Sequence, residues 1–401
     1  MSQVIVLKGL MLGVALSLIA MILLPPGRRG RIAGGAVLGL GLGFGIAATM
    51  PPGYLAYLIS FLVMASIYAM LALGLNTQWG YNGHLNFGVA GFFAVGAFTS
   101  ALFTIEAPTG LAAAYTQVAF GLELPFLAGV AAAAVVSGVV AFLIAVPVLR
   151  LRLDFLAIAT IGIAEIIRLV FQNERWLANG PQPLRGIPQP GRCLFQSARC
   201  DWLPEWALWL VEPLGTRDYN AFYLVIVAVF LAATYALVER ACRSPWGRML
   251  RAVRDEEASA AMNGKAVAFV RIQSFVMGAV IMGIAGALYA HYMVAIDYAH
   301  FHALFATFLV WIMLMLGGSG NHRGAVAGAI LVWGVWSGTS FLANALDPVL
   351  AMIHADMAGR AHYIRWLLVA ILLAGVVLYR PQGLLSEEMR VSRYLRDGRG
   401  R

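Results

Sequence analysis

Long apolar runs constrain this chain more than any other feature of its sequence. A bilayer core about 30 Å thick needs about 20 helical residues to cross it, so each run predicts a membrane-spanning helix. Only 12% of the residues are charged, where soluble proteins average roughly a quarter. The sequence therefore predicts an all-α polytopic membrane protein with about ten or eleven transmembrane helices. The predicted spans are 4–24, 32–50, 54–75, 85–105, 126–149, 154–171, 221–238, 270–293, 303–316, 324–345 and 364–379, of which 303–316 is short enough for a partial or tilted span.

The orientation follows from the lysines and arginines. The run 4–24 lacks a small-residue cleavage site, and its basic cluster at 28–31 follows it, which favours a retained helix with its N-terminus outside. Threading the spans from there puts most of the basic residues on the inner side. We therefore expect a periplasmic N-terminus and a cytoplasmic C-terminus.

The longest outer loop, about 172–220, contains two cysteines with six residues between them, Cys193 and Cys200. In an oxidising periplasm they are expected to form a disulfide. The alternative is two thiols in a cytoplasmic loop, which requires the inverted topology. Cys242 lies on the inner side, where we expect it to stay reduced.

The inner segment 239–269 is unusually rich in charge for this chain. Trp246, Leu250, Val253 and Ala261 fall near one helical face, and Gly264 is expected to give a stop or bend between two short helices. An interfacial helix on anionic lipid is the simpler interpretation. It explains the acidic residues 255–257 poorly, so we favour docking on a protein surface. The residues assigned to this docking are Trp246, Gly247, Arg248, Leu250, Arg251, Arg254, Asp255, Glu256, Glu257, Ala258 and Gly264.

Within this segment, GRMLRAVRDEEASAAMNG resembles the cytoplasmic coupling loop of ABC importer permeases. Other stretches are similar to the LivM-like permease subunit of the branched-chain amino acid importers, also called hydrophobic amino acid uptake transporters. They are GLNTQWGYNGHLNFGVAGFFAVGAF at 74–98, AEIIRLV at 164–170, NGPQPLRGIP at 179–188, LGGSGNHRGAVAGA at 316–329 and RPQGLL at 380–385. Residues 1–50 match less clearly.

The resemblance implies a type II ABC importer-like permease fold over 51–385, after N-terminal helices in 1–50 and before a basic cytoplasmic tail at 386–401. It implies ATP-driven uptake across a bacterial inner membrane. The expected partners are a homologous LivH-like permease (an identical copy being the alternative), two ABC ATPases carrying ATP and magnesium, a periplasmic substrate-binding protein and membrane lipid. This chain itself is expected to be no enzyme, to bind no cofactor or metal and to bind no nucleic acid. Its one Gly-Lys pair, at 264–265, lacks the remainder of a phosphate-binding P-loop.

The substrate is left open among several classes. His84 and Asn86 stand where the LivM-like pattern has glutamine-like and serine-like residues, and Pro183 replaces a glycine. Relatives carry branched-chain amino acids, other amino acids, urea or short amides, and small carboxylates. A secondary transporter without ATPases is the rival of another class, but it would normally need carboxylates at mid-membrane, where Glu165 is the one candidate.

Glycine-rich breaks at 80–88 and 317–324 are each followed by a small-residue helix, which predicts an inverted internal repeat flanking a translocation path. Close helix packing is the equally weighted alternative. The residues assigned to the path are Asn76, Asn82, His84, Asn86, Glu165 and Arg168. Hydrogen bonding between helices is the simpler role for the first four, and an i,i+3 ion pair for the last two.

Overall fold

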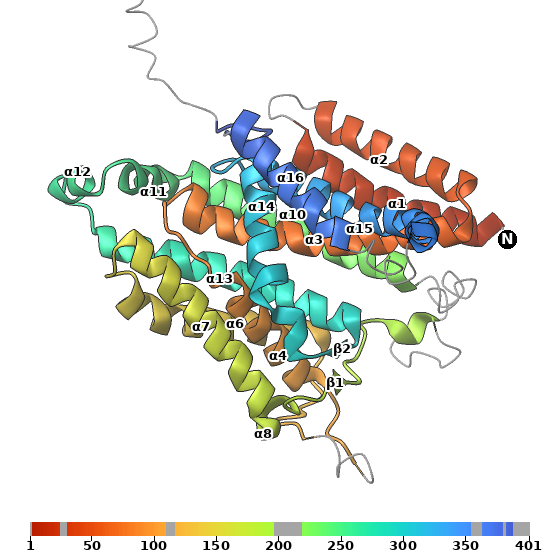
Figure 1. Cartoon of the computed structure of the whole chain (residues 1–401), viewed down its shortest axis with the longest axis horizontal. Coiled ribbons are helices and arrows are strands. Elements are labelled where there is room, and N and C mark those ends of the chain that lie inside the picture. The colour runs from red at the N-terminus through yellow and green to blue at the C-terminus, as the bar shows by residue number, and fades with distance from the viewer. Residues whose placement is uncertain are drawn as a thin grey trace, which may run out of the picture.

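The computed structural model describes residues 2–24, 30–109, 117–195, 219–353, 363–379 and 382–387 as a bundle of helices (Figure 1). Its main helices are α1 (Ser2–Leu23), α2 (Gly30–Thr49), α3 (Pro52–Leu75), α4 (Val89–Thr104), α6 (Phe126–Val148), α7 (Leu153–Asn173), α10 (Tyr219–Arg243), α13 (Val267–Met293), α14 (Leu309–Gly317), α15 (His322–Ile353) and α16 (Ile364–Tyr379). Shorter helices are α8 (Arg175–Ala178), α11 (Pro245–Asp255) and α12 (Glu257–Met262). Single turns of other helix types are η1 (Asn76–Gly80), η2 (Arg192–Phe195), η4 (Tyr298–Phe301) and η5 (Leu304–Phe308).

A helix lies on every predicted span, and the predicted all-α membrane fold is confirmed. Six described helices are long and apolar enough to cross a membrane: 6–23, 52–80, 126–148, 219–243, 267–293 and 322–347. Shorter apolar helices cover 34–49, 89–104 and 304–317. Several predicted limits differ from the structure. α4 begins at Val89 instead of residue 85, α10 ends at Arg243 instead of residue 238, and α15 ends at Ile353 instead of residue 345.

The centre of the bundle is formed by α3, α4 and α13. All residues from Ala65 to Leu75 of α3 are buried, as expected for a helix that is apolar on every side. α4 packs along α13, where a Cβ on Gly96 would collide with the backbone of Gly283. Small residues at such crossings let helix backbones approach closely in membranes.

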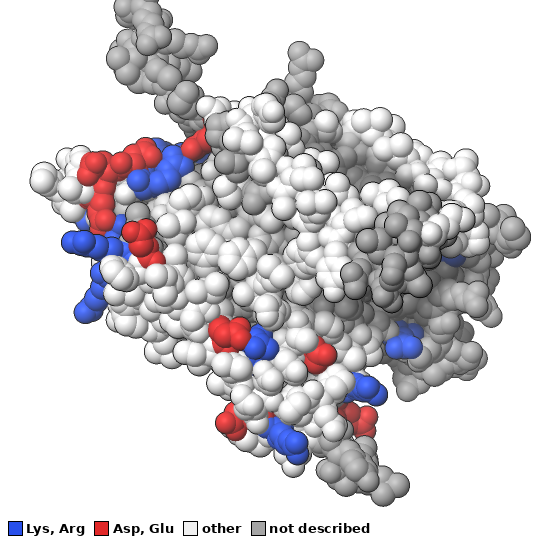
Figure 2. All heavy atoms as spheres, in the orientation of Figure 1, with Lys and Arg blue, Asp and Glu red and all other residues white. Residues whose placement is uncertain are grey.

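A small antiparallel sheet lies at the opposite end of the bundle from α11 and α12 (Figure 1). β1 (Leu184–Arg185) pairs with β2 (Ala295–Ile296), and Ile187 N donates to Val294 O at 3.1 Å. These contacts fix the segment after α7 against the end of α13. Charged side chains gather over the α11–α12 end of the visible face and, in a second group, along its lower part, whereas the area between the two groups is almost free of charge (Figure 2).

Candidate functional site

The predicted docking segment forms two short helices that project from one end of the bundle (Figure 1). α11 begins after Ser244, whose hydroxyl accepts from Trp246 N at 3.2 Å, and Pro245 occupies its first turn, where a missing N–H costs nothing. Gly247, Leu250 and Val253 face inward on α11, and Ala260 faces inward on α12. The sequence placed Ala261 on this face, which was wrong: Ala261 is exposed, and Ala260, seven residues after Val253, is buried in its place.

The break lies at Glu256, which has an extended backbone with φ −157° and ψ 102°. Gly264 lies beyond α12 with φ +72°, so it terminates the second helix and does not separate the two. The predicted bend at Gly264 was therefore misplaced. Its left-handed backbone still explains the glycine, since other residues adopt that conformation at a cost.

The outward side of this segment is strongly exposed. Asp255, Glu256, Glu257 and Ala258 are exposed, as is Arg248. Met262, at the end of α12, leaves 87% of its surface uncovered. An apolar side chain this exposed, beside acidic residues and outside the apolar bundle, is suited to a partner with an apolar groove and basic groups.

The inward side of the segment is fixed by Arg254. Its Nη1 donates to Gly80 O at 2.5 Å and lies 2.9 Å from Glu387 Oε2, and its Nε lies 3.2 Å from Asp255 Oδ1. Burial lowers the pKa of Arg254, but its hydrogen bonds and ion pairs with Glu387 and Asp255 outweigh this and raise the pKa overall. One guanidinium therefore joins α11, the end of η1 and the C-terminal segment.

Two further contacts join the segment to α13. Trp246 Nε1 donates to Gln273 Oε1 at 2.9 Å, and Arg271 Nη2 donates to Glu257 Oε2 at 2.5 Å. Through these two bonds, a displacement of α11 and α12 would also displace the first turns of α13.

The two glycine-rich breaks contact each other beside α11. Gly320 N donates to Asn76 Oδ1 at 2.9 Å, and Asn76 Nδ2 lies 3.0 Å from His322 Nδ1. The rings of Tyr81 and His322 stack with centroids 4.6 Å apart, and the Arg251 guanidinium lies 5.9 Å from the Tyr81 ring centre. From the sequence, we expected these two breaks to flank one translocation path, with close helix packing as the alternative. The contact between the breaks agrees with both interpretations equally.

The sequence did not predict the position of the C-terminal segment 382–387, which contacts the end of α14 and Arg254. Leu384 N donates to Leu316 O at 2.9 Å and Leu385 N to Gly317 O at 3.0 Å, so the segment satisfies carbonyls at the end of α14. Gly318 and Gly383 touch backbone to backbone, both with positive φ. The RPQGLL stretch was the available signal, but sequence alone could not say which helix end it would contact.

The other residues assigned to the path have protein partners. Asn82 Nδ2 donates to Ser274 Oγ and lies 3.0 Å from His84 Nδ1. Asn86 Nδ2 donates to Gln78 Oε1 at 2.6 Å, and its Oδ1 accepts from Gly88 N. These contacts agree with the simpler role predicted for these residues, which is hydrogen bonding between segments. The path role of Asn76, Asn82, His84 and Asn86 stays a prediction.

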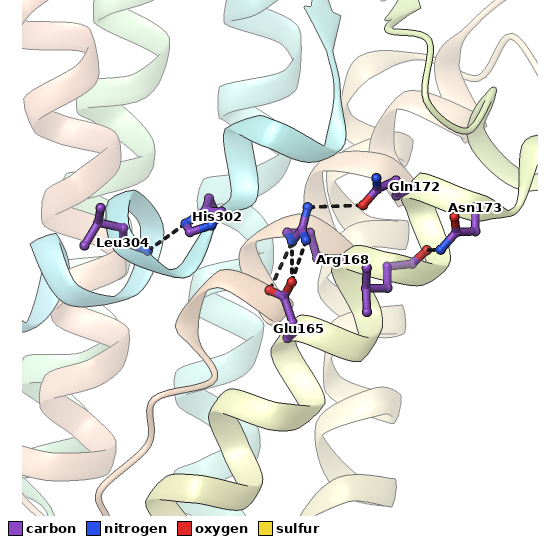
Figure 3. A network of polar contacts seen from close by, with 7 residues as sticks. Glu165, Arg168, Gln172, Asn173, His302 and Leu304 are labelled. Carbon is purple, nitrogen blue, oxygen red and sulfur yellow. Dashed lines mark hydrogen bonds and ion pairs between the residues drawn. The ribbon is translucent and has the colours of Figure 1, made fainter.

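Glu165 and Arg168 form the expected ion pair on α7 (Figure 3). Arg168 Nε lies 2.9 and 3.0 Å from the two Glu165 oxygens, and its guanidinium lies 5.5 Å from the Tyr298 ring centre in η4. Figure 3 shows the pair facing the segment that contains His302. The pair thus lies on the side of α7 that faces η4, and its path role also stays a prediction.

Of the predicted disulfide, Cys193 is disulfide-bonded in the structure, and Cys200 lies outside the described residues. The pairing of these two cysteines stays a prediction. Cys242 is an unpaired thiol buried near the start of α11.

Comparison with known proteins assigns the family. The family model for the branched-chain amino acid transport system / permease component matches residues 57–378. This chain belongs to that permease family. High-affinity branched-chain amino acid transport system permease proteins LivM of Salmonella typhimurium and of Escherichia coli are each 28% identical over 325 residues, covering 80% of this chain and 68% of theirs. No solved structure matches.

Membership of the branched-chain permease family confirms the resemblance found in the motifs. The matched range covers η1, both glycine-rich breaks and the α11–α12 segment. Arg254 and its partners Gly80 and Asp255 therefore lie inside it. Residues 382–387 lie just beyond its end. The chain is a multi-pass membrane transport permease rather than an enzyme.

Proposed function

We propose that this chain is one membrane subunit of an ATP-driven importer, and that α11 and α12 receive the movement of a partner ATPase. The observation that carries the proposal is the two-sided construction of this segment. Its outward side is exposed and ends in Met262, while its inward side is fixed by Arg254, Trp246 and Glu257. A rigid lever between a partner and a bundle needs both properties.

In this mechanism the ATPase supplies the free energy and the chain transmits it. Closure of two ATPases would displace α11 and α12. Through Arg254 the displacement would reach the break at Gly80, and through Gln273 and Arg271 it would reach α13. Because helices shift as packed units, such a movement can open a path on one side of the membrane and close it on the other.

We propose branched-chain or related amino acids as the solute. The related permeases of Salmonella typhimurium and Escherichia coli are named for branched-chain amino acid transport. Specificity would reside mainly in a periplasmic binding protein that docks on the outer loop at 172–220. Asn76, Asn82, His84, Asn86, Glu165 and Arg168 remain the proposed contacts along the path.

The proposed assembly pairs this chain with a homologous LivH-like permease and two ATPases that hold ATP and magnesium. The proposed setting is the inner membrane of a bacterium, with the N-terminus in the periplasm and the C-terminus in the cytoplasm. The distribution of lysines and arginines along the sequence supports that orientation.

The test is a substitution on the exposed tip of α12. Met262→Glu places a charge where an apolar partner surface is proposed, while Met262→Leu keeps the apolar character. Since 87% of Met262 is exposed, neither change should disturb the bundle. We expect Met262→Glu to reduce the substrate-stimulated ATP hydrolysis of the reconstituted complex about tenfold or more, as for loss of an interface anchor, and Met262→Leu to retain it.

Full stimulation in Met262→Glu would contradict docking at this tip. Purification of the chain without any ATPase, together with proton- or sodium-driven uptake by the chain alone in liposomes, would instead support a secondary transporter.

A further inference from the structure

A cavity of about 710 Å³ opens beside the base of the α11–α12 segment, where α6 ends and α7 and α13 begin. Its size is that of typical small-molecule sites. One side is apolar and the other is charged. The apolar lining comes from Ala145, Val146, Leu149, Leu156 and Ile272, and the polar lining from His84, Arg150, Arg152, Glu257 and Arg271.

The charged side has an excess of positive charge. Three arginines face one carboxylate, and that carboxylate, on Glu257, already accepts from Arg271 Nη2. Arg150 and Arg152 are exposed and form no ion pair within the described part of the chain. The Nε of Arg271 is buried, and no hydrogen-bond partner for it lies among the described residues.

His84 adds a neutral donor to the same wall. It is only 2% exposed, and its Nδ1 accepts from Asn82 Nδ2 at 3.0 Å, which places the ring proton on Nε2. Burial, with a smaller contribution from Arg271, lowers the pKa of His84 to about 3, so the ring is neutral near pH 7. No described residue accepts from Nε2. An unpartnered buried donor costs about 1–3 kcal/mol, which an oxygen-bearing anion would recover.

The apolar side of the cavity lies beside exposed apolar residues of α6 and α7, and Val146 belongs to both. Phe142, Leu143 and Val146 are exposed on α6, and Phe155 and Ile158 are exposed on α7, with between 38% and 68% of each residue uncovered. These residues flank the arginines at 150 and 152 along the chain. A ligand with both an anionic group and acyl chains would therefore satisfy both sides of the cavity, whereas a small free anion would satisfy only one.

We propose that this cavity binds the headgroup of an anionic phospholipid. Arg150, Arg152 and Arg271 would contact the phosphate, and the acyl chains would lie along α6 and α7. His84 Nε2 would donate to one of the phosphate oxygens, a role that would replace the path contact proposed for His84. Basic pockets between transmembrane helices near a membrane surface commonly bind acidic lipid headgroups. Because Arg271 also holds Glu257 at the start of α12, the lipid would contact the residue pair that joins α12 to α13.

The experiment measures lipid binding to the full-length chain in a neutral detergent by native mass spectrometry. The probe is dioctanoyl phosphatidylglycerol, with dioctanoyl phosphatidylcholine as the uncharged-headgroup control. We expect one phosphatidylglycerol to bind per chain, and the Arg150→Gln/Arg152→Gln variant to bind it about tenfold more weakly or worse. Arg240→Gln is the matched control, since Arg240 is exposed at the end of α10 and lies outside the cavity lining.

Three results would overturn the proposal. Equal retention of phosphatidylcholine would show that charge is not recognised, and unchanged affinity in the double variant would place the lipid elsewhere. Displacement of phosphatidylglycerol by millimolar inorganic phosphate would identify a small-anion site. Thermal unfolding of the double variant without added lipid, expected to match the unmodified chain, separates loss of binding from loss of folding. The readout requires no ATPase, so it is independent of the proposed import function.

Discussion

Arg254 joins the α11–α12 segment to two distant parts of the described chain. Its partners lie far away in the sequence: Gly80 O is 174 residues away and Glu387 is 133 residues away. Arginine suits this position because its planar group presents five donors in fixed directions, so it can bond a carbonyl and a carboxylate together. Sequence alone identified Arg254 as one charge on an exposed helix, but no local pattern could reveal partners so distant.

We expect Arg254→Ala to lower the free energy of unfolding by about 2 kcal/mol, since it removes hydrogen bonds to a charged group and leaves Gly80 O unpaired. Arg254→Lys should recover only part of this, because one ammonium cannot reproduce the forked geometry. The measurement is thermal unfolding of the full chain in detergent. Glu387→Gln is the companion variant.

The double variant Arg254→Ala/Glu387→Gln distinguishes a direct pair from two separate effects. If the two side chains interact as observed, the double variant should be less destabilised than the sum of the single variants, by about 1 kcal/mol. Strict additivity would mean that Glu387 does not stabilise Arg254 in solution.

At the scale of elements, the hairpin of α14 and α15 depends on glycines at its closest approach. A Cβ on Gly328 of α15 would collide with Met313 O of α14, whereas a Cβ on Gly338 of the same helix would meet nothing within 4 Å. The two glycines thus form a matched pair with the same helical backbone and different surroundings.

Gly328→Ala should lower the free energy of unfolding by about 1–3 kcal/mol, the usual cost of overpacking a close contact. Gly338→Ala should instead be neutral or stabilise by up to about 1 kcal/mol, because alanine restricts the unfolded chain and fits the helix. Unfolding of both variants, followed by helical circular dichroism in the same detergent, makes the comparison. Equal destabilisation by both changes would argue against the close packing of α14 on α15.

Element positions were largely predictable because the bilayer imposes one length on every span. The glycine-rich breaks were predicted, but the residue at which the helix resumes after the first break was not. Residues 85–88 were predicted to belong to a span, yet they are not helical: Asn86 Oδ1 accepts locally from Gly88 N, and Trp311 of α14 donates to Asn86 O. The second bond comes from tertiary packing and could not be read from the hydropathy pattern. The same holds for Glu256, whose extended backbone displaced the predicted bend from Gly264.

At the scale of the whole molecule, α13 determines how far apart the α11–α12 segment and the β1–β2 sheet lie along the membrane normal. It begins beside α12 and ends at β2, and its 27 residues give a length of about 40 Å, longer than a hydrocarbon core of about 30 Å. The α11–α12 segment and the β1–β2 sheet lie at opposite ends of the bundle (Figure 1), so with α13 crossing the membrane they are expected on opposite sides of it. One labelling result at each end is enough to determine the orientation of both.

Met262→Cys and Arg185→Cys provide these two positions, since both side chains are exposed, on α12 and on β1 respectively. If the α11–α12 segment lies in the cytoplasm as proposed, a membrane-impermeant maleimide should label the cysteine at 185 in intact cells and the cysteine at 262 only in inverted vesicles. The unmodified chain serves as the blank, since its buried Cys242 should react little. The reverse pattern would show an inverted orientation, which would put α11 and α12 where no ATPase could reach them. Labelling of both positions from one side would contradict the path of α13 itself.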